Sequence, residues 1–247
     1  MRLTGKTAIV TGGGSGFGEG IAKTYAREGA NVVVNDLNGA AAERVASEIA
    51  IAGGKAIAVA GNVALREDWQ KLREAALEDF GSVQIVVNNA GTTHRNKPVL
   101  DVTEAEFDRV YAVNVKAPFF LVAELAPAMA KRGHGAIINI GTMVAQFGAA
   151  EMALYGSSKA ALVLLTKSWA AEYGPAGVRV NAVSPGPTRT EGTAAMGEAL
   201  DQLAAAAPGG RPGLPEEIAA AITYLASDAA SFVHGAVLPV DGGRIAV

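Results

Sequence analysis

The stretch Thr11-Gly-Gly-Gly-Ser-Gly-Phe-Gly18 decides the fold of this chain of 247 residues. The apolar run Lys6–Thr11 leads into it and a helical pattern over 17–28 follows, so the glycines connect a strand to the start of a helix. Glycine at such a connection permits a tight turn and a close approach of the backbone to a pyrophosphate at the positive end of the helix. The predicted cofactor-binding residues of this loop are Gly12, Ser15, Gly16, Phe17 and Gly18.

The next strand-like run, Asn31–Asp36, ends in a carboxylate 18 residues after Gly18. A carboxylate at this distance from the loop can accept hydrogen bonds from an adenosine ribose, so Asp36 joins the predicted dinucleotide site. Its negative charge would oppose a 2′-phosphate, and neither Leu37 nor Ser15 supplies a compensating cation. The sequence therefore predicts NAD rather than NADP as the cofactor.

Short apolar runs alternate with helical patterns along the whole chain. Continuous apolar runs are typical of parallel strands covered on both faces, and their alternation with helices predicts a right-handed, doubly wound α/β sheet. The predicted strands are Lys6–Thr11, Asn31–Asp36, Lys55–Gly61, Ile85–Asn88, Ala136–Ile140, Val178–Ser184 and Ala236–Pro239. The predicted helices are 17–28, 39–52, 66–80, 103–113, 115–132, 155–173 and 215–227. Because no linker-like stretch interrupts this order, we expect a single Rossmann-type domain over 1–247, with about seven parallel strands and helices on both faces.

The composition excludes several classes of function. The net charge is −3 and no basic run stands out, so nucleic acid is not an expected partner. The chain has no cysteine, which excludes disulfides, thiol nucleophiles and zinc–thiolate sites. The three histidines, His94, His134 and His234, are isolated, so no metal site is predicted.

Membrane and targeting signals are weak as well. Met1 is followed by a charged, strand-forming start rather than by an apolar signal core. The apolar stretch Ala117–Ala130 is interrupted by Glu124 and Pro127, so we expect no membrane span. These observations predict a cytoplasmic protein that acts on a small-molecule substrate.

Tyr155-x-x-x-Lys159 opens the helix that follows the fifth predicted strand. Residues four apart lie on one face of a helix. We expect the lysine ammonium, together with positively charged NAD, to lower the tyrosine pKa from its ordinary value of about 10. Tyr155 is then a candidate proton donor for reduction and proton acceptor for oxidation.

These residues resemble the motifs of the short-chain dehydrogenase/reductase family, in the NAD-preferring branch with subunits of about this length. The resemblance covers the whole chain in order. Its motifs are Thr11–Gly18 (TGxxxGxG), Asn88–Gly91 (NNAG), Asn114, Tyr155 with Lys159 (YxxxK), Pro185-Gly186 and Asp241–Gly243.

The resemblance implies roles for several of these residues. Asn114 would bend a helix and hold a water near the lysine, and Lys159 would also bind the nicotinamide ribose. The NNAG motif would stabilise the central sheet and border the adenosine, while Thr188 would meet the carboxamide. The implied cofactor contacts outside the glycine loop and Asp36 are Asn62, Val63, Asn89, Tyr155, Lys159 and Thr188.

Two positions depart from the family pattern. Thr142 occupies the position of the usual catalytic serine, 13 residues before the tyrosine, and keeps its hydroxyl while adding a methyl group. Asn62 occupies the position of a common adenine-binding aspartate, and its amide oxygen can still accept a hydrogen bond. The predicted catalytic residues are therefore Asn114, Thr142, Tyr155 and Lys159.

The favoured function is hydride transfer between NAD(H) and a carbonyl compound or secondary alcohol. A 3-oxoacyl-thioester reductase is the alternative within this class, although its usual NADPH disagrees with Asp36. A halohydrin dehalogenase-like lyase would lack the glycine loop and the lysine at 159, both of which this chain has. A dinucleotide sensor without turnover is also considered, and the intact Tyr155–Lys159 pair argues against it.

Three further expectations concern assembly, a lid and the substrate loop. The helix 155–173 is apolar nearly all round, so one side should meet a partner subunit, and the resemblance implies a homotetramer. The proline-rich segment Pro185–Leu214 is expected to be a mobile lid, with short helices within Gly192–Ala207. We interpret His94, Arg95, Lys97 and Arg189 as solvated loop residues rather than substrate ligands. The substrate itself is left open.

Overall fold

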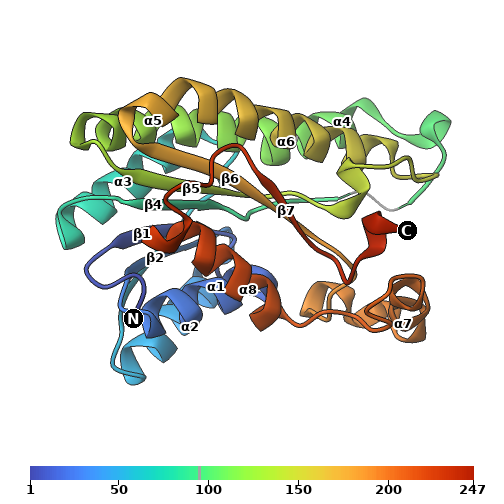
Figure 1. Cartoon of the computed structure of the whole chain (residues 1–247), viewed down its shortest axis with the longest axis horizontal. Coiled ribbons are helices and arrows are strands. Elements are labelled where there is room, and N and C mark those ends of the chain that lie inside the picture. Colours follow the sequence, from blue (N-terminus) through green and yellow to red (C-terminus); the bar gives the residue numbers. More distant parts are fainter. Residues whose placement is uncertain (94–95) are drawn as a thin grey trace.

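The computed structural model describes residues 1–93 and 96–247 and contains a seven-stranded parallel sheet (Figure 1). The strand order is β3-β2-β1-β4-β5-β6-β7, so the order reverses between β1 and β4. In such sheets, ligands bind at this switch point, beyond the carboxyl ends of the strands. The strands are β1 (Thr7–Thr11), β2 (Asn31–Asp36), β3 (Lys55–Ala60), β4 (Ile85–Asn88), β5 (Gly135–Ile140), β6 (Val178–Pro185) and β7 (Val237–Val240). Each predicted strand is confirmed to within one residue at either end.

Helices cover both faces of the sheet, as predicted. One face carries α1 (Gly16–Arg27), α2 (Gly39–Ile51) and α8 (Pro215–Ala226) (Figure 1). The other face carries α3 (Arg66–Phe80), α4 (Glu104–Tyr111), α5 (Ala117–Arg132) and α6 (Ala153–Tyr173). A shorter helix, α7 (Glu198–Ala205), lies beyond the sheet edge, near the C-terminus.

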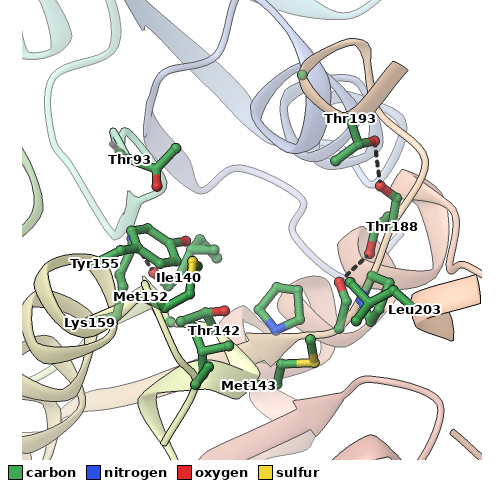
Figure 2. A pocket seen from close by; sticks show the side chains of 18 of the residues that line it. Thr93, Ile140, Thr142, Met143, Met152, Tyr155, Lys159, Thr188, Thr193 and Leu203 are labelled. Atoms are coloured by element: carbon green, nitrogen blue, oxygen red, sulfur yellow. Dashed lines mark hydrogen bonds between the residues drawn. The ribbon is translucent and has the colours of Figure 1, made fainter. Parts of the chain in front are cut away.

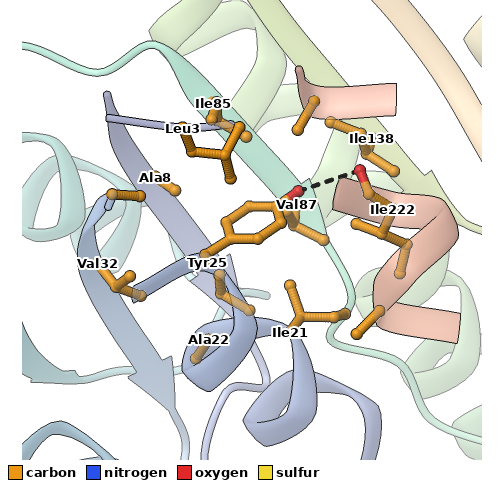
Figure 3. Close-up of a cluster of buried hydrophobic side chains, with 14 of the residues drawn as sticks. Leu3, Ala8, Ile21, Ala22, Tyr25, Val32, Ile85, Val87, Ile138 and Ile222 are labelled. Atoms are coloured by element: carbon orange, nitrogen blue, oxygen red, sulfur yellow. Dashed lines mark hydrogen bonds between the residues drawn. The ribbon is translucent and has the colours of Figure 1, made fainter. Parts of the chain in front are cut away.

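The two faces bury separate apolar clusters, because successive strand residues point to opposite sides of the sheet. Ala8 and Val10 pack into the first cluster and Ile9 into the second, and all three are fully buried. Figure 3 shows the first cluster around Tyr25 of α1, whose hydroxyl donates to the carbonyl of Ile222 at 3.5 Å. Because successive strand residues enter opposite clusters, the helices on both faces pack on the same strands that carry the site.

The segment 103–132 differs from its prediction as two helices, 103–113 and 115–132. The Thr103–Glu106 capping box starts α4 as expected, but α4 then continues through a π-helical turn, Ala112–Lys116 (η2), into α5. The resulting 29-residue helical stretch, Glu104–Arg132, is by length and composition able to cross a bilayer. No stretch of this kind was expected from the sequence. Here α5 packs on the sheet and buries Leu121, Leu125 and Met129.

The segment after β6 contains the short helices predicted within Gly192–Ala207, namely η5 (Glu191–Met196) and α7. Its two ends are held together at the base by a parallel bridge between Thr188 and Gly213. Gly213 N donates to Pro187 O and Arg189 N donates to Gly213 O, each at 2.9 Å. The segment is therefore a loop with closed ends that stands beside the carboxyl edge of the sheet.

Candidate active site

The glycine loop between β1 and α1 is built from positions that reject side chains. A Cβ at Gly18 would lie 1.9 Å from Gly12 O, so the loop packs directly on the first turn of α1. Gly12 and Gly16 have φ angles of 62° and 53°, which favour glycine. Ser15 is the N-cap of α1, and the first amides of a helix have no partner within it.

Asp36 ends β2 and holds the glycine loop through its carboxylate. Oδ2 accepts a hydrogen bond from Gly14 N and Oδ1 accepts one from Asn38 N, each at 2.9 Å. A Cβ at Gly14 would lie 2.9 Å from the carboxyl carbon of Asp36, so the loop approaches the carboxylate as closely as glycine permits. Asp36 thus lies beside the loop, as the sequence predicts.

One cation near this carboxylate was missed by sequence reasoning. Arg44 of α2 donates to Gly14 O at 2.9 Å. It also pairs with Glu19 at 2.6 Å and with Glu48 at 2.8 Å, while Lys23 contacts both of these carboxylates at 2.5 Å. The two cations and two carboxylates offset one another, so Arg44 adds little free positive charge beside the loop.

A cleft of about 650 Å³ opens beside the loop at the switch point of the sheet. Its lining includes the predicted cofactor residues Gly12, Ser15, Gly16, Phe17, Asp36, Asn62, Val63 and Asn89. The remaining loop prediction, Gly18, is buried beneath it. Asn62 already accepts a hydrogen bond on Oδ1 from Ala64 N at 3.0 Å, so only one lone pair of that oxygen stays open. Arg109 of α4 also lines the cleft, and sequence reasoning did not single it out.

Asn89 fastens the loop to β4. Its Nδ2 donates to Thr11 O at 2.8 Å and to Gly12 O at 3.0 Å, while the Thr11 hydroxyl accepts from the backbone of Asn89 and Ala90. Asn88 in turn donates to Asn139 of β5 at 2.8 Å within the buried sheet. The NNAG motif therefore joins the three strands β1, β4 and β5 at the edge where the cleft opens.

A second cavity of about 790 Å³ adjoins the cleft and shares several of its lining residues, including Phe17 and Asn89. Three of the four predicted catalytic residues, Thr142, Tyr155 and Lys159, line it (Figure 2). They come from the loop after β5 and from the first turns of α6. The structure thus brings together the catalytic residues that the sequence separates by 17 positions.

The pKa of Tyr155 moves against the sequence expectation. Burial raises the pKa of Tyr155 above its ordinary value, and a hydrogen bond with the Thr142 side chain opposes part of this rise. Lys159 is 3% exposed, and burial lowers its own pKa to about 8. Burial therefore opposes the expected lowering of the tyrosine pKa in the protein alone, and the lowering by Lys159 together with bound NAD stays a prediction.

Asn114, the fourth predicted catalytic residue, lies behind the cavity rather than in its lining. It is fully buried in the π turn, where Oδ1 accepts from Thr92 N at 2.9 Å. Nδ2 donates to Thr92 O at 2.9 Å and to the Ser158 hydroxyl at 3.0 Å. Lys159 Nζ donates to Ile140 O at 2.8 Å. These contacts make Asn114 a brace between the loop after β4 and the start of α6.

The segment after β6 and the C-terminal turn also line the cavity. Thr188 lines the cavity, its hydroxyl donating to Gly186 O at 2.9 Å and its carbonyl accepting from the Thr193 hydroxyl at 2.8 Å (Figure 2). Asp241 accepts hydrogen bonds from the backbone amides of Gly243 and Ile245 and so shapes the C-terminal turn. Arg244 and Phe147 also line the cavity, and sequence reasoning did not single out Arg244.

Four loop residues were interpreted as solvated, namely His94, Arg95, Lys97 and Arg189, and the structure describes two of them. His94 and Arg95 lie outside the described residues. Lys97 pairs with Glu106 at 2.7 Å, and Arg189 pairs with Asp201 at 2.5 Å. Lys97 and Arg189 are not among the described residues that line the catalytic cavity, which agrees with their interpretation as solvated loop residues.

Comparisons with known proteins agree with this geometry. A family model described as enoyl-(acyl carrier protein) reductase matches residues 12–244. The chain is 44% identical to 4-formylbenzenesulfonate dehydrogenase of Comamonas testosteroni over 99% of both chains. A solved structure of 7α-hydroxysteroid dehydrogenase with NADH and 7-oxo glycochenodeoxycholic acid has a TM-score of 0.94 at 40% identity, covering 98% of this chain and 95% of the other. A structure assigned as an NAD(P)-dependent gluconate 5-dehydrogenase from Beutenbergia cavernae, with bound NADP, has a TM-score of 0.93 at 39% identity, covering 100% and 99%.

Fold and site together define a dinucleotide-dependent oxidoreductase. The relatives are named as dehydrogenases or reductases, and the matches extend over essentially the full length of both partners. This chain belongs to the short-chain dehydrogenase/reductase family. It is an enzyme that acts on alcohol and carbonyl groups with a nicotinamide dinucleotide.

Proposed function

We propose that this enzyme uses NAD(H) to interconvert a carbonyl compound and a secondary alcohol, with Tyr155 as the proton donor and acceptor. The observation that carries the proposal is one continuous site. The cavity lined by Tyr155, Thr142 and Lys159 adjoins the cleft lined by the glycine loop and Asp36. A dinucleotide in the cleft can therefore reach a substrate in the cavity.

The loop fits such a cofactor, because its glycines have no side chains and the loop backbone and the start of α1 therefore face the cleft directly. A bound nicotinamide dinucleotide supplies or accepts the hydride at the substrate carbon. Tyr155 gives its hydroxyl proton to the substrate oxygen in reduction and takes a proton from it in oxidation. Thr142 donates a second hydrogen bond to the same oxygen.

Lys159 and Asn114 support this proton transfer. With a pKa of about 8, Lys159 is largely protonated at neutral pH, and its positive charge stabilises the tyrosinate that forms. Its bond to Ile140 O holds Nζ beneath the cavity. Asn114 fixes the turn in which Lys159 lies through the Ser158 hydroxyl, so it acts as a positioning residue.

Selection of NAD over NADP follows from the charge at the end of β2. Asp36 lines the cleft with its carboxylate, and the nearby Arg44 is engaged by Glu19 and Glu48. A 2′-phosphate at this position would meet a negative charge with little compensation. A 3-oxoacyl-thioester reductase that uses NADPH stays a second prediction, and the charge of Asp36 opposes it.

The proposal is tested by turnover and by the Tyr155→Phe variant. We expect NADH formation with NAD and at least one member of a panel of sugars, polyols, hydroxy acids and cyclic alcohols. Tyr155→Phe keeps the ring and removes the proton donor, so kcat should fall by at least about 10² while NADH affinity is retained. Binding of NADH without turnover of any panel member, in either direction, would favour a dinucleotide sensor and overturn the proposal.

We also propose that the protein is a homotetramer. Phe119 and Phe120 of α5 are 44% and 43% exposed, and Leu164 of α6 is 64% exposed. Exposed apolar patches of this kind mark interaction surfaces, and dihedral tetramers bury them in pairs. Light scattering at micromolar concentration should report four subunits, and a monomer would contradict the proposal. A cytoplasmic location stays a prediction.

A further inference from the structure

The catalytic cavity carries a positive charge, that of Arg244, which the proposed reaction does not use. Arg244 begins the short C-terminal turn Arg244–Ala246 (η7) and lines the cavity. Asp241 shapes this turn, because its Oδ1 accepts from Gly243 N at 2.9 Å and its Oδ2 accepts from Ile245 N at 3.0 Å. Hydrogen bonds from two backbone amides to the Asp241 carboxylate therefore fix the turn that carries Arg244.

The guanidinium of Arg244 has unused hydrogen-bonding capacity. Its Nε is buried without a hydrogen-bond partner, and Nη1 reaches only Val247 O, at the limiting distance of 3.5 Å. Within residues 1–93 and 96–247, none of the ion pairs includes Arg244. Because Nε is closed to solvent, a ligand would accept from the terminal Nη1 and Nη2 groups, for which Val247 O is the acceptor found among the described residues.

The described lining of the cavity places an aromatic ring against Arg244 and contains several large apolar side chains. The guanidinium carbon lies 5.4 Å from the centre of the Phe147 ring, which supports a planar cation over an aromatic face. In the described part of the lining, Lys159 is the other charged residue and neither aspartate nor glutamate occurs. The large apolar side chains of the lining include Met143, Val144, Phe147, Met152, Leu200 and Leu203.

We propose that Arg244 binds an anionic group of the substrate. The substrate is then an apolar carbonyl compound or alcohol that bears a carboxylate or another oxyanion away from the reacting carbon. Arg244 suits this role because its planar fork can donate two parallel hydrogen bonds to an oxyanion, and the apolar walls strengthen a charge pair. This inference rests on the proposed function, since it assigns a further residue of the same cavity.

A matched pair of ketones tests the charge requirement, namely 4-acetylbenzoate and its neutral methyl ester. Reduction of either ketone consumes one NADH and one proton and yields NAD⁺ and the secondary alcohol. In the wild-type enzyme, kcat/KM for the acid should exceed that for the ester by about tenfold or more. Arg244→Met should lower kcat/KM for the acid by about tenfold to a hundredfold, mostly through KM, and leave the ester nearly unchanged.

Two further variants separate the site from the overall charge of the protein. Arg244→Lys keeps the charge without the fork and should retain part of the preference for the acid. Arg27→Met removes the same charge from an exposed position on α1 and should leave the preference intact. Equal kcat/KM for acid and ester in the wild type, or an equal loss of both in Arg244→Met, would overturn the inference.

Calorimetric titration of both ketones into the protein without NADH gives a readout that does not depend on turnover. Binding of 4-acetylbenzoate that is lost in Arg244→Met supports the inference, even if no ketone or alcohol is turned over and the proposed function fails. Oxidation of panel alcohols without any Arg244-dependent binding or preference would overturn the inference and leave the proposed function standing.

Discussion

Replacing Thr142 by valine would remove one hydroxyl from the catalytic cavity and little else. The backbone at Thr142 is extended, with φ −164° and ψ 154°, a conformation that β-branched side chains favour. Valine has nearly the same shape, and the hydroxyl makes no capping bond to the turn that follows. We therefore expect the free energy of unfolding to change by less than about 1 kcal/mol.

The catalytic loss should be much larger than the loss of stability. As the substrate oxygen gains negative charge, Thr142 and Tyr155 both donate to it in the proposed mechanism. Loss of one such donor costs about 10²–10³ in kcat, or roughly 3–4 kcal/mol. Affinity for NAD(H) should barely change, because Thr142 lines the catalytic cavity and is not among the residues that line the adjoining cleft.

The variant should also shift the pH profile. The Thr142 hydrogen bond lowers the pKa of Tyr155 against the effect of burial, so its loss raises that pKa further. Alcohol oxidation needs Tyr155 as a proton acceptor, and its activity should therefore rise only at higher pH in Thr142→Val.

The assay is kcat and kcat/KM for alcohol oxidation between about pH 6 and about pH 10, with NADH affinity measured in parallel. Thr142→Ser is the matched control, because it keeps the hydroxyl and removes only a methyl group, and it should retain activity. Near-normal kcat with an unshifted profile in Thr142→Val would refute the reasoning. The catalytic set would then shrink to Tyr155 and Lys159, with Asn114 as a positioning residue.

Three other predictions follow from the same site. The wild-type enzyme should favour NAD(H) over NADP(H) by at least about tenfold in kcat/KM, and this ratio should be smaller in Asp36→Asn. Equal kcat/KM with both cofactors in the wild type would contradict the role of Asp36. Burial lowers the pKa of Lys159 to about 8, so between about pH 8 and about pH 10 the unfolded chain binds more protons than the folded one, and stability should rise with pH relative to Lys159→Met. If the unfolding free energies of the wild type and of Lys159→Met depended on pH in the same way, burial would not lower the pKa of Lys159. Hydrogen exchange in η5 and α7 should slow when NAD and substrate bind, and equal protection in both states would argue against a lid.

The sheet could be predicted closely because both of its faces are covered. Runs such as Val32–Val34 are continuously apolar, and polar residues mark their ends. The break expected between 103–113 and 115–132 was wrong, because a π turn continues the helix through Asn114, the residue that the family resemblance expects to bend a helix. From the sequence, only the shorter stretch Ala117–Ala130 was considered. The joined helical stretch Glu104–Arg132, which is long and apolar enough to cross a bilayer, was not foreseen.

The cofactor cleft was predictable because its residues stand at strand ends that a parallel sheet brings to one edge. The glycine loop, Asp36 and Asn89 each follow a predicted strand. Arg44 and Arg244 were missed because they reach the site through tertiary packing, from a helix and from the C-terminal turn. The burial of Tyr155, which raises its pKa, was missed for a related reason, since it depends on surrounding elements that the local motif does not reveal.

The π turn Ala112–Lys116 lets one extra residue bulge from a helix whose two halves stay in phase. An α-helix advances about 100° per residue, and a π turn accommodates one extra residue in about the same rotation and rise. Deleting one residue there would therefore restore a uniform α-helix and leave α4 and α5 close to their present orientations. The face of α5 that carries Leu121 and Leu125 would stay on the sheet, whereas Asn114 would lose the bulge from which it bonds Thr92 and Ser158. A one-residue deletion in this turn would thus loosen the site while the core keeps its packing.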